Sequence, residues 1–150
     1  MPINLPLTVV TNSPEESIIL GEKFANLLEK GSIVALLGPI GAGKTCFAKG
    51  IAKGLGINEE VTSPTYTIVS EYSGFLKQEK LNVYHIDAYR LTGNDDFSAM
   101  GGEEIVYGDG ISLIEWSENI PGFISNKAFF VDIKIVQDNE RIIRIYRAET

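Results

Sequence analysis

The chain has 150 residues, of which 44% are hydrophobic and 22% charged, so we expect one globular domain, residues 1–150, with a sizeable core. The formal net charge is −7, which argues against strong direct binding to nucleic acid, because such binding depends on Lys and Arg. One cysteine cannot form an internal disulfide, and no apolar run approaches the about 18 residues of a membrane helix. These features predict a cytoplasmic protein without membrane contact.

The negative charge is concentrated in one stretch of the chain. Seven acids and no Lys or Arg lie between Leu91 and Asn126, whereas the remainder carries thirteen residues of each sign. Such a stretch is usually a solvated face, and the alternative is that part of it docks a basic partner or holds a metal. The acids are Asp95, Asp96, Glu103, Glu104, Asp109, Glu115 and Glu118.

The first third of the chain alternates strand and helix signals. Residues 7–11 predict a short strand, and residues 13–16 (Ser-Pro-Glu-Glu) are typical of a helix start. Apolar residues at helical spacing extend this helix toward Gly31, the predicted stop. Residues 33–37 form an unbroken apolar run, which indicates a strand buried on both faces of a parallel sheet. A second helix is predicted over residues 45–55.

The rest of the chain favours hairpins and short elements. Residues 65–72 with 81–87, and 128–136 with 141–147, alternate like the paired strands of two hairpins. Between the hairpins, a short helix over 94–100, loops at 101–102 and 108–110, and an apolar strand over 111–114 are expected. Buried parallel-type strands, helices and hairpins together predict an α/β fold with a mixed sheet.

Residues 38–45 fit the phosphate-binding pattern G-x-x-x-x-G-K-[ST] at every fixed position. Glycines let backbone N–H groups turn toward phosphate oxygens, Lys44 supplies positive charge, and Thr45 offers a hydroxyl to Mg²⁺. The order strand, loop, helix predicts a three-layer fold of the P-loop NTPase type with a partly parallel sheet and antiparallel hairpins. The candidate nucleotide-binding residues of the loop are Gly38, Pro39, Ile40, Gly41, Ala42, Gly43, Lys44 and Thr45.

A P-loop hydrolase also needs an acid beside its metal, at the end of a neighbouring strand. Asp87 ends the predicted strand over 83–86, and Glu115 ends the one over 111–114. At least one of the two is expected to be functional, and chemistry alone does not rank them.

Four further positions are candidates with an ordinary structural alternative. Residues 63–66 (Ser-Pro-Thr-Tyr) follow the P-loop helix, where a loop that senses the γ-phosphate is expected, although this sequence is also typical of a turn. His85 is expected to be a core or cross-strand histidine, with a catalytic role as the alternative, and Cys46 is expected to pack. Trp116 either packs in the core or flanks a nucleotide or partner.

Four segments together resemble the bacterial TsaE (YjeE) family, the ATPase of tRNA threonylcarbamoyladenosine biosynthesis. They are residues 38–45, 62–67 (Thr-Ser-Pro-Thr-Tyr-Thr), 85–91 (His-Ile-Asp-Ala-Tyr-Arg-Leu) and 114–116 (Ile-Glu-Trp). The order, the spacing and the total length match, and the resemblance covers nearly the whole chain. The Ser-Pro-Thr-Tyr, His-x-Asp-x-Tyr-Arg and Glu-Trp motifs are much more specific than the P-loop alone.

The resemblance implies a slow, partner-dependent ATP hydrolase that uses ATP and Mg²⁺. It also implies binding to a two-protein threonylcarbamoyltransferase complex, which modifies an adenosine beside the tRNA anticodon and is reset by hydrolysis. Lys44, Asp87 and Glu115 would be catalytic, with Asp87 as the catalytic carboxylate or the acid that positions water. Thr45 and Glu115 would hold Mg²⁺, while Thr65 and Trp116 would lie at the nucleotide.

The chain departs from the family pattern within the loop. Family members usually have Asp or Asn and then Leu where this chain has Pro39 and Ile40, and a second Thr where it has Cys46. Pro39 lacks a backbone N–H, so one phosphate contact is expected to be missing or shifted.

Three alternatives remain open at this point. A small-molecule kinase shares the P-loop but usually carries Arg residues over the phosphates, and Arg is scarce here. A GTPase would read guanine with Asn-Lys-x-Asp, whereas residues 126–129 are Asn-Lys-Ala-Phe. A non-enzymatic regulator would bind nucleotide and partners without hydrolysis.

Overall fold

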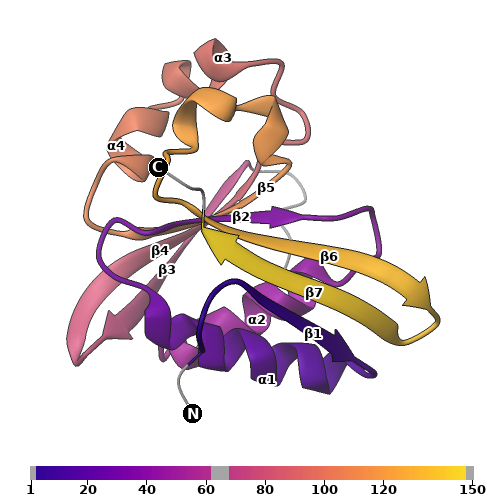
Figure 1. Cartoon of the computed structure of the whole chain (residues 1–150). Coiled ribbons are helices and arrows are strands. Elements are labelled where there is room, and N and C mark those ends of the chain that lie inside the picture. The colour runs from indigo at the N-terminus through magenta and orange to yellow at the C-terminus, as the bar shows by residue number, and fades with distance from the viewer. Residues whose placement is uncertain (1–2, 62–67, 148–150) are drawn as a thin grey trace.

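A computed structural model of the chain describes residues 3–61 and 68–147, in which one seven-stranded sheet has helices on both of its faces (Figure 1). The strands are β1 (Leu7–Thr11), β2 (Ile33–Leu37), β3 (Val69–Leu76), β4 (Glu79–Asp87), β5 (Ile111–Glu115), β6 (Phe129–Gln137) and β7 (Glu140–Arg147). The α-helices are α1 (Pro14–Phe24), α2 (Lys44–Gly54), α3 (Asn94–Ala99) and α4 (Gly102–Val106), and the 3₁₀ turns are η1 (Ala25–Leu27), η2 (Ser117–Asn119) and η3 (Pro121–Phe123).

The sheet has a parallel centre and antiparallel edges. Its order is β1-β7-β6-β2-β5-β4-β3, with β2 parallel to both β5 and β6, and β5 parallel to β4. The hairpins β3–β4 and β6–β7 are antiparallel, and β1 pairs antiparallel with β7. The predicted α/β fold with a mixed, partly parallel sheet and antiparallel hairpins is confirmed. The apolar runs of β2 and β5 are buried because both strands lie in the middle of the sheet, between the two helical layers.

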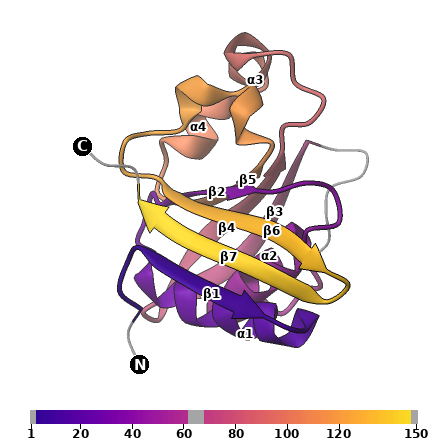
Figure 2. The same ribbon diagram turned by 45° about the vertical axis from the view of Figure 1, so that its right-hand side comes forward.

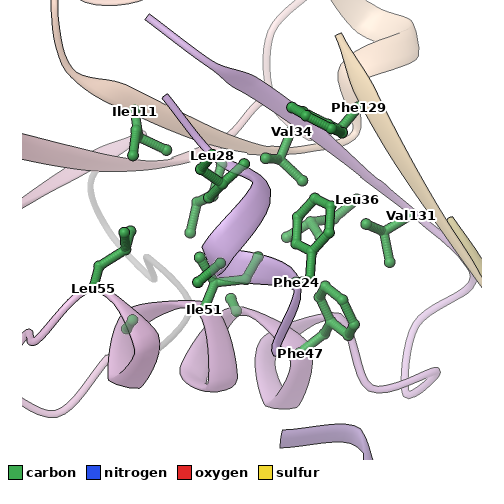
Figure 3. Packing of buried hydrophobic residues seen from close by; sticks show 14 of the residues in the cluster. Phe24, Leu28, Val34, Leu36, Phe47, Ile51, Leu55, Ile111, Phe129 and Val131 are labelled. Atoms are coloured by element: carbon green, nitrogen blue, oxygen red, sulfur yellow. The ribbon is translucent and has the colours of Figure 1, made fainter. Parts of the chain in front are cut away.

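Helices α1 and α2 cover one face of the sheet, and their apolar side chains build the larger core (Figure 3). Phe24 of α1 contacts Phe47 of α2 with ring centroids 5.7 Å apart, and Phe129 of β6 at 5.3 Å. Glycines let the two helices approach closely: a Cβ on Gly50 would lie 2.1 Å from the carbonyl oxygen of Ile18. This packing anchors the start of α2, where the P-loop ends.

The opposite face carries α3, α4 and the two 3₁₀ turns η2 and η3 (Figure 2). Phe97 and Phe123 meet edge to face in this second core, with centroids 4.8 Å apart. The acidic stretch forms this layer, and six of its seven acids are exposed, which agrees with a solvated face. Glu115 is the exception, because it is buried at the end of β5.

Two details of the predicted elements are wrong. Helix α1 ends at Phe24 instead of continuing toward Gly31, because the chain tightens into η1 and then extends at Leu28, which still buries its side chain in the same core. Gly102 starts α4 instead of lying in a loop. Only Met100 and Gly101 separate the two short helices, and Gly101 is in the left-handed conformation.

Residues 62–67 lie outside the described residues, so the first part of the strand predicted over 65–72 is not described. Strand β3 begins at Val69. No helix in the two described ranges is long and apolar enough to cross a membrane.

Candidate nucleotide site

The P-loop connects the central strand β2 to helix α2 and faces outward at the carboxyl end of the sheet. Gly41 and Gly43 have φ values of 81° and 108°, which only glycine adopts readily. A Cβ at either position would meet nothing within 4 Å, so backbone conformation, not crowding, requires glycine there. The open space over these residues, next to the amino end of α2, is a cradle suited to an anion.

Lys44 lies at the centre of the site. Its side chain is only 7% exposed, and its Nζ donates a hydrogen bond of 2.8 Å to the carbonyl oxygen of Gly38. The same Nζ lies 4.0 Å from Oε1 of Glu115 and 4.7 Å from the ring centroid of Trp116. The lysine is therefore held between the loop, an acid and an aromatic ring, with only a long contact to the acid.

The two candidate acids come together because their strands are parallel neighbours. The pairing of β4 with β5 places Asp87 opposite Glu115. Glu115 is buried and accepts a 2.7 Å hydrogen bond from Nε2 of His85. Asp87 is half-buried, and its Oδ1 accepts the backbone N–H of Tyr89 at 3.0 Å. Both carboxylates lie at the carboxyl edge of the sheet, and Glu115 lines a cavity together with P-loop residues.

Two cavities flank the loop and share Gly41, Gly43 and Cys46. A cavity of about 300 Å³ is lined by Ile40, Gly41, Gly43, Lys44, Thr45, Cys46, Glu115 and Trp116. A second cavity of about 210 Å³ is lined by Ser13, Pro14, Ser17, Gly41, Ala42, Gly43, Cys46, Asn139 and Arg141. The first holds the charged groups, and the second is a less charged hollow between the start of α1 and the β6–β7 hairpin.

Arg141 attaches the P-loop to the β6–β7 hairpin. Its Nε donates to the carbonyl oxygen of Ala42 at 2.9 Å, and its Nη2 donates to that of Gly41 at 3.3 Å. Its Nη1 donates to carbonyl oxygens of the hairpin turn, including that of Asp138 at 2.9 Å. Sequence reasoning missed this residue because 99 positions separate it from Ala42, and no local pattern connects the two segments.

The structure groups most of the sequence-predicted site residues around one cavity. Asp87 borders the site without lining either cavity, and Thr65 lies outside the described residues. Cys46, expected only to pack, is half-buried and lines both cavities. His85 is buried, as expected of a core or cross-strand histidine, and its cross-strand partner is Glu115 on the neighbouring β5.

The donor set fits Mg²⁺ bound together with phosphate. Among residues 3–61 and 68–147, no group of three or more His, Cys, Asp or Glu could hold a metal by itself. Thr45 and Glu115, the predicted metal residues, line the same cavity as Lys44. Mg²⁺ in nucleotide sites usually takes one or two protein oxygens and completes its shell with phosphates and water.

A glycine loop with its lysine between a buried parallel strand and a helix, and acids at neighbouring strand ends, defines a fold of the P-loop NTPase type. A crystal structure of Bacillus subtilis YdiB superimposes with a TM-score of 0.77 and 31% identity, over 99% of this chain and 90% of that one. The family model for "Threonylcarbamoyl adenosine biosynthesis protein TsaE" matches residues 11–144, so the chain belongs to the TsaE family.

Curated relatives agree with this family. A protein of Treponema pallidum is 40% identical over 136 residues, covering 91% of this chain and 97% of its own length. One of Bacillus subtilis is 38% identical over 133 residues, covering 89% of this chain and 80% of its own length. Both are described as tRNA threonylcarbamoyladenosine biosynthesis protein TsaE. The expected resemblance to the TsaE family is thereby confirmed.

Proposed function

We propose that this protein is a cytoplasmic, Mg²⁺-dependent ATPase of tRNA threonylcarbamoyladenosine biosynthesis, acting as one domain. The observation that carries the proposal is Lys44, buried between the P-loop, Glu115 and Trp116 at the mouth of one cavity. A buried cation beside an open glycine cradle is suited to nucleotide phosphates, which would replace the carbonyl oxygen of Gly38 as its partner.

The two cavities suggest how ATP is divided between them. In this proposal the phosphates occupy the charged cavity, where loop N–H groups, the amino end of α2 and Lys44 bind them. The base occupies the smaller cavity, whose walls are the start of α1 and the hairpin residues Asn139 and Arg141. Gly41 and Gly43 line both the phosphate cavity and the base cavity.

The acids at the strand ends have different proposed roles. Thr45 and Glu115 hold Mg²⁺, which when bound neutralises charge on the phosphates. Asp87 positions the attacking water or accepts its proton, a role suited to a half-buried carboxylate next to the metal side of the site. Glu115 is buried, so water screens the interaction of its charge with neighbouring groups less than it would at the surface.

The relatives' description places those proteins in tRNA modification, and we propose that this chain serves the same pathway. It would bind a two-protein threonylcarbamoyltransferase complex and reset it through hydrolysis. The net charge of the whole sequence, −7, is unsuited to tight direct tRNA binding. The tRNA contact is therefore assigned to the partners.

The test is ATP hydrolysis by the protein with and without its presumed partner pair. We expect a large stimulation that is lost in Glu115→Gln and retained in the matched control Glu118→Gln, an exposed acid three residues away. Absence of stimulation, together with no stable complex on gel filtration, would refute the proposal. Phosphorylation of a small acceptor in place of hydrolysis would instead establish a kinase.

A further inference from the structure

We propose that His85 is a positioning residue for Glu115. It holds one carboxylate oxygen, so that the other is directed at Lys44 and at the cation site. The inference rests on the proposed function, in which Glu115 contributes to Mg²⁺ binding.

The contact between the two residues is short and buried. Nε2 of His85 lies 2.7 Å from Oε2 of Glu115, and the side chains are 1% and 8% exposed. A carboxylate can only accept, so the hydrogen in this bond is assigned to Nε2 of the imidazole. Hydrogen bonds to charged groups are stronger than those between neutral groups, so this bond favours one side-chain orientation of Glu115.

The His85 ring makes no second hydrogen bond to any of the described residues. Its Nδ1 is buried and has no hydrogen-bond partner there. An apolar side chain would fill this position on β4 without burying an unpaired nitrogen, whose desolvation is unfavourable. The bond to Glu115 is therefore the interaction that distinguishes histidine from an apolar residue at this position.

The other carboxylate oxygen is left for the site. Oε1 of Glu115 lies 4.0 Å from Nζ of Lys44, whose hydrogen bond goes to Gly38 instead. The two oxygens thus have different neighbours: Oε2 contacts the histidine and Oε1 lies nearest the lysine, and Glu115 as a residue lines the charged cavity. Groups that orient a metal-binding carboxylate typically change metal affinity by about 10- to 100-fold when they are removed.

A Mg²⁺ titration of nucleotide binding tests this inference, with the fluorescence of Trp116 as the readout. Trp116 is the sole tryptophan and lines the charged cavity. In His85→Leu the Mg²⁺ concentration at half-saturation should rise by about 10- to 100-fold, while ADP affinity in EDTA should stay within about threefold. His85→Gln, whose amide can donate in place of Nε2, should restore most of the Mg²⁺ affinity.

Ser112→Ala is the matched control. Ser112 is a buried polar residue of β5, paired with Tyr84 of β4, and its hydroxyl has no hydrogen-bond partner among the described residues. This variant should titrate like wild type. An equal loss of ADP affinity with and without Mg²⁺ in His85→Leu would show a merely structural role and overturn the inference.

A double-variant comparison keeps the inference testable if His85→Leu does not fold. His85→Gln should shift the Mg²⁺ response slightly in the wild-type background and not at all in Glu115→Gln, because the proposed effect passes through that carboxylate. The same shift in both backgrounds would overturn it. Wild-type protein without any Mg²⁺-dependent nucleotide signal would refute the proposed function itself. A wild-type signal that His85→Leu leaves unchanged would refute only the role of His85.

Discussion

Two lysine–glutamate pairs of this protein differ in a way that distance alone does not reveal. Lys30 and Glu79 are 2.8 Å apart, with side chains 54% and 66% exposed. Lys44 and Glu115 are 4.0 Å apart and nearly inaccessible, at 7% and 8%. The shorter pair lies in water near the amino end of β4, and the longer pair lies at the carboxyl edge beside the P-loop.

Burial, and not the distance between the two charged groups, separates the charges of the candidate nucleotide site from an ordinary surface pair. Attraction between unit charges 4 Å apart is about four times stronger at the effective dielectric of a protein than in water. The Lys30–Glu79 contact raises the pKa of Lys30 and lowers that of Glu79, mainly through their hydrogen bond, but solvent and salt screen such a pair. Lys44, by contrast, is sequestered with incomplete pairing to Glu115, which suits a group that is to receive phosphate.

Asp87→Asn tests a third charged residue, at the carboxyl edge of the sheet. Of the substitutions considered, it should have the largest effect, a decrease in the rate of ATP hydrolysis. If Asp87 handles the attacking water, the hydrolysis rate should fall by about 10²- to 10⁴-fold. Nucleotide affinity should hardly change, because Asp87 does not line the cavities. Single-turnover hydrolysis and equilibrium binding separate the two quantities. Equal losses of both would assign Asp87 to folding instead.

Lys44→Ala tests the buried pair directly. The substitution removes a charged hydrogen-bond donor to phosphate, a contribution of about 2–3 kcal/mol to binding. ATP affinity should therefore decrease by about 30- to 150-fold. Isothermal titration calorimetry measures this change, and Lys30→Ala is the matched control that should bind like wild type. Wild-type affinity in Lys44→Ala would contradict the assignment of the site.

Arg141→Met should have an intermediate effect, because Arg141 acts on the P-loop through its carbonyl oxygens. Losing the bonds to Ala42 and Gly41, each contributing about 1 kcal/mol, predicts a decrease in nucleotide affinity of about 5- to 30-fold. Arg144→Met removes an arginine of the same strand that stacks on Tyr146, and it should leave affinity unchanged. An identical response of both variants would exclude a specific role for Arg141.

Glu79→Gln should have the smallest effect, since it breaks only the exposed pair. The lowered pKa of Glu79 means that its contribution to stability exists above its ordinary value of 4.5 and is lost as pH falls through the lowered value. The raised pKa of Lys30 means that its contribution exists below 10.5 and is lost as pH rises through the raised value. Thermal midpoints of variant and wild type should therefore differ by a small, constant amount from about pH 6 to 9.

Salt provides the control for this last prediction, because added salt should remove the remaining difference between Glu79→Gln and wild type. A large destabilisation by Glu79→Gln that persists at high salt would contradict the view that the exposed Lys30–Glu79 pair contributes little because solvent screens it.

The P-loop, the alternation of strands and helices, and the family were all predictable from the amino-acid sequence. These features are readable because they depend on local patterns: the apolar run of β2, the glycines and Lys44 of the loop, and the helix start at Ser13. Even the acid Glu115 was identified locally, from its place at the end of an apolar strand. Local misjudgements occurred where tertiary packing overrode the pattern, as at the end of α1 and at Gly102.

The contacts between the charged and polar side chains of the site were not predictable, because they join segments that are far apart in sequence. The pairing of β4 with β5 brings His85 to Glu115 across 30 positions, and the return of β7 brings Arg141 to the P-loop across 99. Of the seven acids between Leu91 and Asn126, Glu115 alone is buried, because β5 lies between β2 and β4 in the middle of the sheet. Such distinctions depend on long-range contacts and on the exclusion of water, which no local pattern encodes.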